Sequence, residues 1–248
     1  MDAKKNIRLI LEYDGTRYSG WQRQKGMPTI QEMLEGALHR IIQEPVTVMA
    51  SGRTDAGVHA LHQVCHFITR SNLDPGALKR GLNSLLPDDI HIKEAGYCPL
   101  DFHSRFSVKS KTYEYRILNR IEQDVFLRSY VWHIRTKLDL NGLQRCCQIL
   151  LGRHDFSSFR SSGSGNINPV REMMRAQLEL TEQGILHFIF EADGFLRHMV
   201  RNIVGTLVEV GRGKRDFEEF KRILASKDRR KAGQKAPPQG LFLTDVRY

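Results

Sequence analysis

The stretch VTVMASGRTDAGVHALHQVCHFIT, from Val46 to Thr69, decides how the first half of the chain folds. VTVMAS and HQVCHFIT are rich in β-branched and apolar residues, which predicts two neighbouring strands. Between them lies SGRTDAGVHA, where small residues surround a single carboxylate, Asp55. Glycines within this segment permit tight turns and close approach by a ligand. The sequence therefore predicts a small turn that presents Asp55 into a space.

Elements on both sides of this stretch predict the order β-α-β-β-α-β. Alternating apolar residues predict a strand from Ile7 to Tyr13 that ends at Asp14-Gly15. A helix follows Pro28, because Thr29-x-x-Glu32 forms a capping box. A second helix begins at Asp74-Pro75 and stops before Pro87, and DIHIKEAGY reads as the last strand.

The second half repeats this alternation with longer connections. Its periodicity predicts strands over Phe106–Leu118, Met173–Leu180, Leu186–Glu191 and Leu241–Tyr248. It predicts helices over Leu140–Leu151 and Phe195–Val210. Two such units predict an α+β protein with two ferredoxin-like βαββαβ halves, residues 1–104 and 105–248. We expect mainly antiparallel sheets, helices on one face and a central basic cleft.

Composition points to a polyanionic partner. The 248 residues carry 38 Lys and Arg against 28 Asp and Glu, a formal charge of +10. This balance favours nucleic acid over a neutral metabolite. Apolar runs are too short for a membrane span or a secretion signal, so a cytoplasmic location is expected. The four cysteines form neither CxxC pairs nor a disulfide framework.

Asp55 has two readings. Asp-x-Gly turns between strands are common, and the aspartate often bonds only its own backbone. Alternatively, Arg53 holds the carboxylate ionised and poised for chemistry, although a surface ion pair would look the same in the sequence.

The strand SVKSKTYEYRI suggests a second candidate surface. By alternation Lys109, Lys111, Tyr113 and Tyr115 share one face, which would suit phosphates and unstacked bases. An edge strand protected by lysines would give the same pattern.

Two arginines flank the apolar stripe of FLRHMVRNIVGTLVEV. Arg197 and Arg201 fall on the rim of that stripe, where they would reach into a cleft. Snorkelling from a partly buried helix is the alternative.

A metal site is not predicted. His59, His62, Cys65 and His66 lie close in sequence, but His62 and Cys65 would point to opposite faces of a strand. The glycines of GRGK and GSG lack the spacing of a phosphate-binding loop, so no nucleotide cofactor is expected either.

Five motifs together resemble the TruA family of tRNA pseudouridine synthases. They span almost the whole chain, in the family's order: YDGTRYSGWQRQ, GRTDAGVHA, FHSRFSVKSKTYEYRI, FLRHMVRNIVGTL and APPQGLFLTDVRY. The resemblance implies isomerisation of uridine to pseudouridine at nucleotides 38, 39 and 40 of the tRNA anticodon stem-loop. It also implies a homodimer and no cofactor or metal.

The resemblance assigns roles to individual residues. Asp55 matches the catalytic aspartate, Tyr113 the tyrosine that stacks on the target base, and Arg201 the arginine that pairs with the catalytic carboxylate. Arg53 matches an arginine that acts near the displaced nucleotide. An apolar residue of GLFL lines the base pocket, either Leu243 or Leu241. Lys109, Lys111 and Arg197 are expected to contact the RNA.

The chemistry of this reaction explains why the turn carries a single carboxylate, Asp55. Breaking the bond between N1 and C1′ develops positive charge on the sugar, which a carboxylate stabilises or attacks. Asp55 could attack C1′, attack the ring, or remove a proton from C2′. A non-catalytic RNA-binding or RNA-chaperone protein with the same basic cleft is the alternative function.

Overall fold

The computed structural model describes residues 3–163 and 168–248, so Ser164 and Gly165 of the serine- and glycine-rich loop lie outside the described residues. The chain divides into two compact units. The N-terminal unit comprises Met1–Lys109 together with Leu243–Tyr248, and the C-terminal unit comprises Ser110–Phe242. The predicted boundary at residue 104 thus lies five residues earlier, and the last six residues belong to the N-terminal unit.

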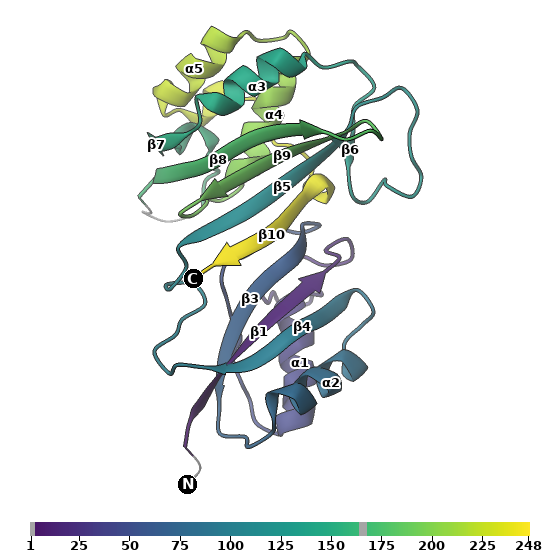
Figure 1. Cartoon of the computed structure of the whole chain (residues 1–248), viewed down its shortest axis with the longest axis vertical. Coiled ribbons are helices and arrows are strands. Elements are labelled where there is room, and N and C mark those ends of the chain that lie inside the picture. The colour runs from purple at the N-terminus through teal and green to yellow at the C-terminus, as the bar shows by residue number, and fades with distance from the viewer. Residues whose placement is uncertain (1–2, 164–167) are drawn as a thin grey trace. The chain divides into compact units, whose positions relative to one another are not determined.

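The N-terminal unit has the predicted βαββαβ order. Its elements are β1 (Lys5–Tyr13), α1 (Ile30–Ile42), β2 (Met49–Ala50), β3 (His59–Thr69), α2 (Pro75–Leu85) and β4 (Ile90–Cys98). Strand β1 lies between β3 and β4 and pairs antiparallel with both, while β2 adds to β3. Helices α1 and α2 lie together beside these strands (Figure 1).

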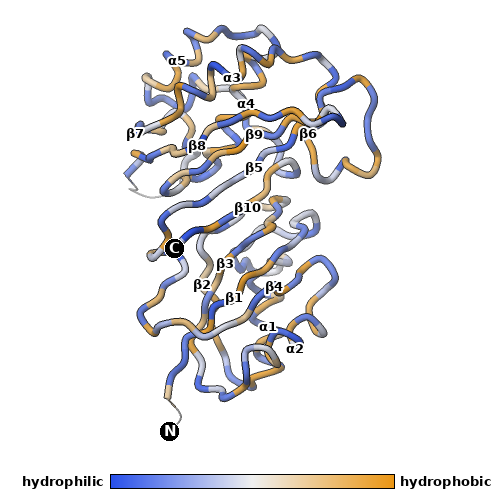
Figure 2. The backbone as a smooth tube through the Cα atoms, in the orientation of Figure 1, coloured by the Kyte–Doolittle hydropathy of each residue, from blue (hydrophilic) through white to orange (hydrophobic). Residues whose placement is uncertain are grey.

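Local sequence signals fix both helices of this unit. The Thr29 hydroxyl accepts a hydrogen bond from the Glu32 N–H, and the Asp74 carboxylate accepts one from the Ala77 N–H, so each caps its helix start. Apolar residues then recur on one face, and Figure 2 shows the resulting alternation of hydrophobic and hydrophilic stretches. Leu34 and Leu38 of α1 are buried, as are Leu78 and Leu82 of α2. This unit confirms the prediction, except that VTVMAS contributes only two residues of strand.

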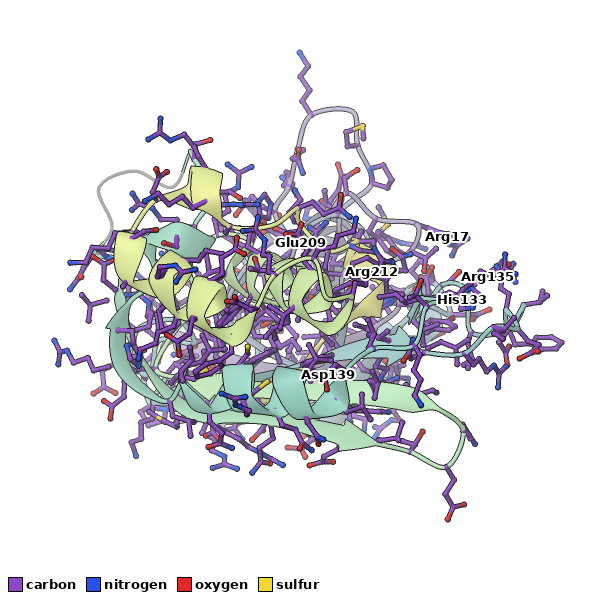
Figure 3. All side chains as sticks on the ribbon, turned by 90° about the horizontal axis from the view of Figure 1, so that it is seen from above. Arg17, His133, Arg135, Asp139, Glu209 and Arg212 are labelled. Carbon is purple, nitrogen blue, oxygen red and sulfur yellow. The ribbon has the colours of Figure 1, made fainter. Side chains whose placement is uncertain are left out.

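The C-terminal unit is more elaborate than predicted. Its elements are β5 (Ser110–Leu118), β6 (Trp132–His133), α3 (Leu140–Gln148), β7 (Gly152–Asp155), η1 (Ser157–Phe159), β8 (Val170–Leu180), β9 (Ile185–Ala192), α4 (Met199–Gly211), α5 (Phe217–Ser226), η2 (Arg229–Lys231) and η3 (Pro238–Gly240). The strand order is β5-β9-β8-β7, all antiparallel, and β6 runs parallel to β5. The helices gather on one side of β8 and β9 (Figure 1), and Asp139 lies at the start of α3 (Figure 3). The last strand, β10 (Leu241–Arg247), crosses from this unit into the other.

Two predicted boundaries in this half are wrong. The strand expected from Phe106 starts only at Ser110, because residues 103–107 fold into a turn in which the Ser107 N–H donates to the His103 carbonyl at 2.9 Å. The helix expected from Phe195 starts at Met199, because His198 has a φ of 62° and so breaks the helical backbone. The α+β class and the mainly antiparallel pairing are confirmed.

The cysteines are free thiols that pack inside the units. Cys65, Cys146 and Cys147 are buried, and Cys98 is half-buried. Burial raises the pKa of Cys146 to about 11 and that of Cys147 to about 12, so both are neutral thiols near pH 7.

Candidate functional site

Asp55 lies on the loop of residues 51–58 between β2 and β3. Its side chain is half-buried, and its carbonyl accepts a hydrogen bond from the Val58 N–H at 3.1 Å, which closes the turn. Arg53, two residues earlier, is exposed and has no ion-pair partner among the described residues. The loop thus carries both predicted residues, one half-buried and one in solvent.

A buried hydrogen-bond network centred on Gln63 of β3 supports this loop. The Gln63 amide oxygen accepts from the Ser51 hydroxyl at 2.7 Å, and its amide nitrogen donates to the Gly52 carbonyl at 2.9 Å. The Tyr13 hydroxyl lies 3.4 Å from the same nitrogen and 2.8 Å from Thr54 Oγ1. Burial raises the pKa of Tyr13 to about 12, so its hydroxyl keeps its proton. Satisfied networks of this kind hold a loop in one geometry.

The segment of residues 13–21 supports the loop through backbone hydrogen bonds. The Trp21 N–H donates to the Thr54 carbonyl at 3.1 Å, and the Gly57 N–H donates to the Tyr18 carbonyl at 3.2 Å. A Cβ atom at Gly20 would lie 2.5 Å from the Thr54 oxygen, and this glycine has a φ of +89°. Only glycine allows so close a backbone approach. The motifs YDGTRYSGW and GRTDAGVHA therefore form one structural unit.

The histidines near this loop have structural partners. His59 Nδ1 lies 3.1 Å from the Gly15 N–H, and His66 Nδ1 accepts from the Ser104 N–H at 3.2 Å. Burial, followed by the charge of His103, lowers the pKa of His66. Within residues 3–163 and 168–248 no three His, Cys, Asp or Glu side chains are placed to hold a metal ion.

Strand β5 of the C-terminal unit carries Tyr113, which is buried and meets the Phe195 ring edge-on at 5.0 Å. Tyr115, predicted on the same binding face, is instead a core residue whose hydroxyl donates to the Pro237 carbonyl at 2.8 Å. Lys111 is half-buried, and Lys109 precedes the strand and is exposed. Both tyrosine rings of this predicted face are therefore buried, whereas Lys109 and Lys111 reach solvent at least in part.

Arg201 lies on α4 but not on an open rim. Only 6% of it is exposed, and its Nε donates to the Ala236 carbonyl at 2.9 Å, while the Ala236 N–H donates back to the Arg201 carbonyl at 3.0 Å. A guanidinium buried in this way has a fixed position, unlike a snorkelling side chain. Arg197 lies in the turn before α4, is exposed, and donates to the Ser162 carbonyl at 2.9 Å.

The chain segment of residues 229–236 covers α4 and explains this burial. The Gly233 N–H donates to the Thr206 hydroxyl at 3.0 Å, and the Arg229 guanidinium donates to Asn202 Oδ1 at 3.0 Å. Glu209, further along α4 (Figure 3), accepts from the Gln234 N–H at 3.3 Å. A Cβ atom at Gly205 would lie 1.8 Å from the Gln234 carbonyl oxygen, so glycine is required there.

The remaining candidates lie on β10. Leu243 is fully buried and belongs to the N-terminal unit, and Leu241 is buried and belongs to the C-terminal unit. The N-terminal unit thus carries Arg53, Asp55, Lys109 and Leu243, whereas the C-terminal unit carries Lys111, Tyr113, Arg197 and Arg201.

Sequence reasoning missed the supporting residues. Gln63 is a polar residue inside the apolar run HQVCHFIT, and an amide in a buried strand signals a hydrogen-bond network. Gly205 interrupts an apolar helix, where glycine costs stability unless packing requires it.

Comparison with known proteins identifies the family. A family model described as tRNA pseudouridine synthase matches residues 9–107 and 146–248. The chain belongs to the tRNA pseudouridine synthase family. It is accordingly an isomerase that acts on tRNA, as the motifs predict.

Individual relatives agree with this assignment. The chain is 46% identical to tRNA pseudouridine synthase A of Acetivibrio thermocellus, over 98% of this chain and 100% of the relative. It is 44% identical to the proteins of the same name from Thermoanaerobacter sp. strain X514 and Clostridium kluyveri, with the same coverage. Of the helices that the structure describes, none is long and apolar enough to cross a membrane.

The first prediction concerns the network beneath the loop. Gln63→Leu should lower the free energy of unfolding by about 2 kcal/mol, because the Ser51 hydroxyl and the Gly52 carbonyl lose their buried partner. A loosened loop should lower kcat of this pseudouridine synthase more than it changes KM. Urea unfolding and steady-state kinetics test both effects, with Gln144→Leu at an exposed position of α3 as the control. Unchanged kcat in a folded Gln63→Leu protein would contradict the role of the network.

The second prediction concerns the contact between α4 and its covering segment. Gly205→Ala should destabilise the protein by about 2 kcal/mol or more, since the new methyl group overlaps the Gln234 carbonyl. Gly36→Ala is the matched control in α1: nothing lies within 4 Å of its Cβ position, so it should stabilise by about 0.5–1 kcal/mol. The Tm of the two variants, measured by thermal unfolding, should therefore shift in opposite directions from that of the wild type. A shift in the same direction would mean that the segment does not pack as described.

Proposed function

We propose that this enzyme converts uridine to pseudouridine at nucleotides 38, 39 and 40 of the tRNA anticodon stem-loop, with Asp55 as its catalytic carboxylate. The observation that supports this most is the loop of residues 51–58, where a half-buried carboxylate stands on a fully hydrogen-bonded buried network. Groups that do chemistry must be held within a fraction of an ångström of their working position. A turn that served only to join β2 and β3 would need no such support.

The reaction needs no added atoms. The bond between N1 and C1′ breaks, the uracil turns, a bond forms between C5 and C1′, the hydrogen of C5 leaves as a proton, and N1 takes up a proton. Asp55 acts either as the nucleophile, at C1′ or on the ring, or as the general base that takes a proton from C2′. Each route uses the ionised carboxylate while positive charge develops on the sugar.

Two residues of the C-terminal unit are proposed to complete the chemistry. Arg201 pairs with the carboxylate of Asp55 and keeps it ionised, a role that a buried guanidinium of fixed geometry can fill. Tyr113 stacks on the target base while it turns, since its ring is already positioned by edge contact with Phe195.

The other candidates are proposed to hold the RNA. A base inside a stacked helix is out of reach, so the nucleotide must flip out. Arg53, exposed on the catalytic loop, would brace the vacated space. Lys109, Lys111 and Arg197 would contact phosphates, and Leu243 would line the base pocket. We also expect a cytoplasmic homodimer that works without cofactor or metal.

The third prediction is that Asp55→Ala and Asp55→Asn abolish isomerisation but keep the fold and the affinity for tRNA. The measurement is tritium release from unmodified tRNA labelled at C5 of uracil, in EDTA. Release requires the new bond to form at C5, so it reports the reaction itself. Asp88→Asn, at an exposed position of the same unit, is the control and should release tritium like the wild type.

Two outcomes would contradict this assignment. Tritium release by Asp55→Ala at the wild-type rate would remove Asp55 from the chemistry. Tight tRNA binding by the wild type without any release would favour the non-catalytic RNA-binding function.

The fourth prediction is that Tyr113→Phe retains a substantial part of the activity, because the phenylalanine ring still stacks on a base. Tyr113→Leu should lose much more, since an aliphatic side chain cannot stack. Single-turnover rates of tritium release compare the two. If Tyr113→Phe were as inactive as Asp55→Ala, the hydroxyl would have a chemical role.

A further inference from the structure

The turn of residues 103–107 in the N-terminal unit displays an exposed aromatic side chain. Phe106 is 76% exposed. The His103 ring lies 4.3 Å from its ring centroid, at an interplanar angle of 36°, and the Arg105 guanidinium lies 5.6 Å from it. We call His103, Arg105 and Phe106 the aromatic platform. A single exposed apolar residue would need no explanation, but an exposed ring with an imidazole against it and a guanidinium near it forms a defined surface feature.

This turn is held rigidly from inside. The Ser104 side chain is fully buried and its hydroxyl donates to the Met49 carbonyl at 2.6 Å, while the Ser104 N–H donates to His66. The Tyr248 hydroxyl donates to the Ser104 carbonyl at 2.7 Å. The Asn6 amide donates to the Phe102 carbonyl at 2.9 Å. Four contacts from different parts of the unit thus fix a turn whose outermost residue packs on little else.

The platform itself is also ordered by local hydrogen bonds. His103 Nδ1 accepts from the Arg105 N–H at 3.1 Å, and the His103 N–H donates to the Ser107 hydroxyl at 3.1 Å. These contacts orient the imidazole against the Phe106 ring before any ligand binds. Preorganisation of this kind lowers the entropy that binding must overcome.

We propose that the aromatic platform binds an unpaired base of the RNA substrate at a point separate from the target nucleotide. Base stacking on exposed aromatic rings, with a cation alongside for the phosphate, is how proteins bind single-stranded RNA. Arg105 has no ion-pair partner among the described residues, so its charge is available. The net charge of +10 favours RNA over a protein partner as the occupant.

The position of the platform supports contact with a second nucleotide. Its turn is anchored at Met49 and His66, which pair with each other, whereas the loop of Asp55 joins β3 at His59, seven residues along the strand. The platform and Asp55 therefore lie on different turns of the N-terminal unit. We place a second nucleotide at the platform, so the inference rests on the proposed RNA substrate but not on the role of Asp55.

The fifth prediction is that Phe106→Ala weakens RNA binding about ten-fold, whereas Phe106→Trp preserves it. Fluorescence anisotropy would measure Kd for unmodified tRNA and for a labelled single-stranded uridine-rich RNA of ten nucleotides. Arg105→Ala should also weaken binding and reduce the slope of log Kd against log salt by about one. Leu100→Ala is the matched control, because Leu100 is 64% exposed on the same segment but is aliphatic, and its Kd should not change.

The outcomes separate this proposal from the proposed function. If a folded Phe106→Ala protein binds both RNAs with the wild-type Kd, the proposed role of the platform is overturned, even if tritium release is normal. The same result accompanied by a change in oligomeric mass would identify the platform as a contact between protein chains and also overturns the proposal. Weaker binding by Phe106→Ala, together with retained binding by Phe106→Trp, supports it even if no tritium is released by the wild type.

Discussion

Backbone contact between residues 13–21 and the loop of residues 51–58 is the constraint on which the N-terminal unit depends. Gly20 places its Cα so close to the Thr54 carbonyl that no other residue fits, and the Trp21 N–H then donates to that carbonyl. Because the buried network at Gln63 bonds the same loop, two separate sets of contacts fix the loop. The position of Asp55 is therefore set both by Gln63 on the next strand and by residues 13–21, which lie more than thirty positions earlier in the sequence.

The C-terminal unit uses a similar device around α4. Gly205 admits the Gln234 carbonyl, and the covering segment then buries Arg201 and bonds it at Ala236. Arginine is costly to bury unless its N–H groups have partners, and this backbone carbonyl offsets part of that cost. In both units a glycine lets one backbone approach another, and a functional candidate is fixed as a result.

Short-range signals made much of the fold predictable. Thr29 and Asp74 cap the helices that the sequence predicts, because capping depends on residues three positions apart. Long-range partners made other features unpredictable. Alternation placed Tyr115 on a binding face, but its hydroxyl meets Pro237, more than a hundred residues away. The site candidates came from motifs, whereas Gln63 and Gly205 owe their roles to contacts that only the folded chain brings together.

The covering segment has a consequence for local opening of the native state. Residues 232–236 have no regular secondary structure, a feature that ordinarily marks a chain region that exchanges its amide hydrogens quickly. Yet the amides of Gly233 and Ala236 donate to groups on α4, which is itself almost wholly buried. The segment can therefore open only when it detaches from the helix, and it belongs to the same cooperative folding unit as α4.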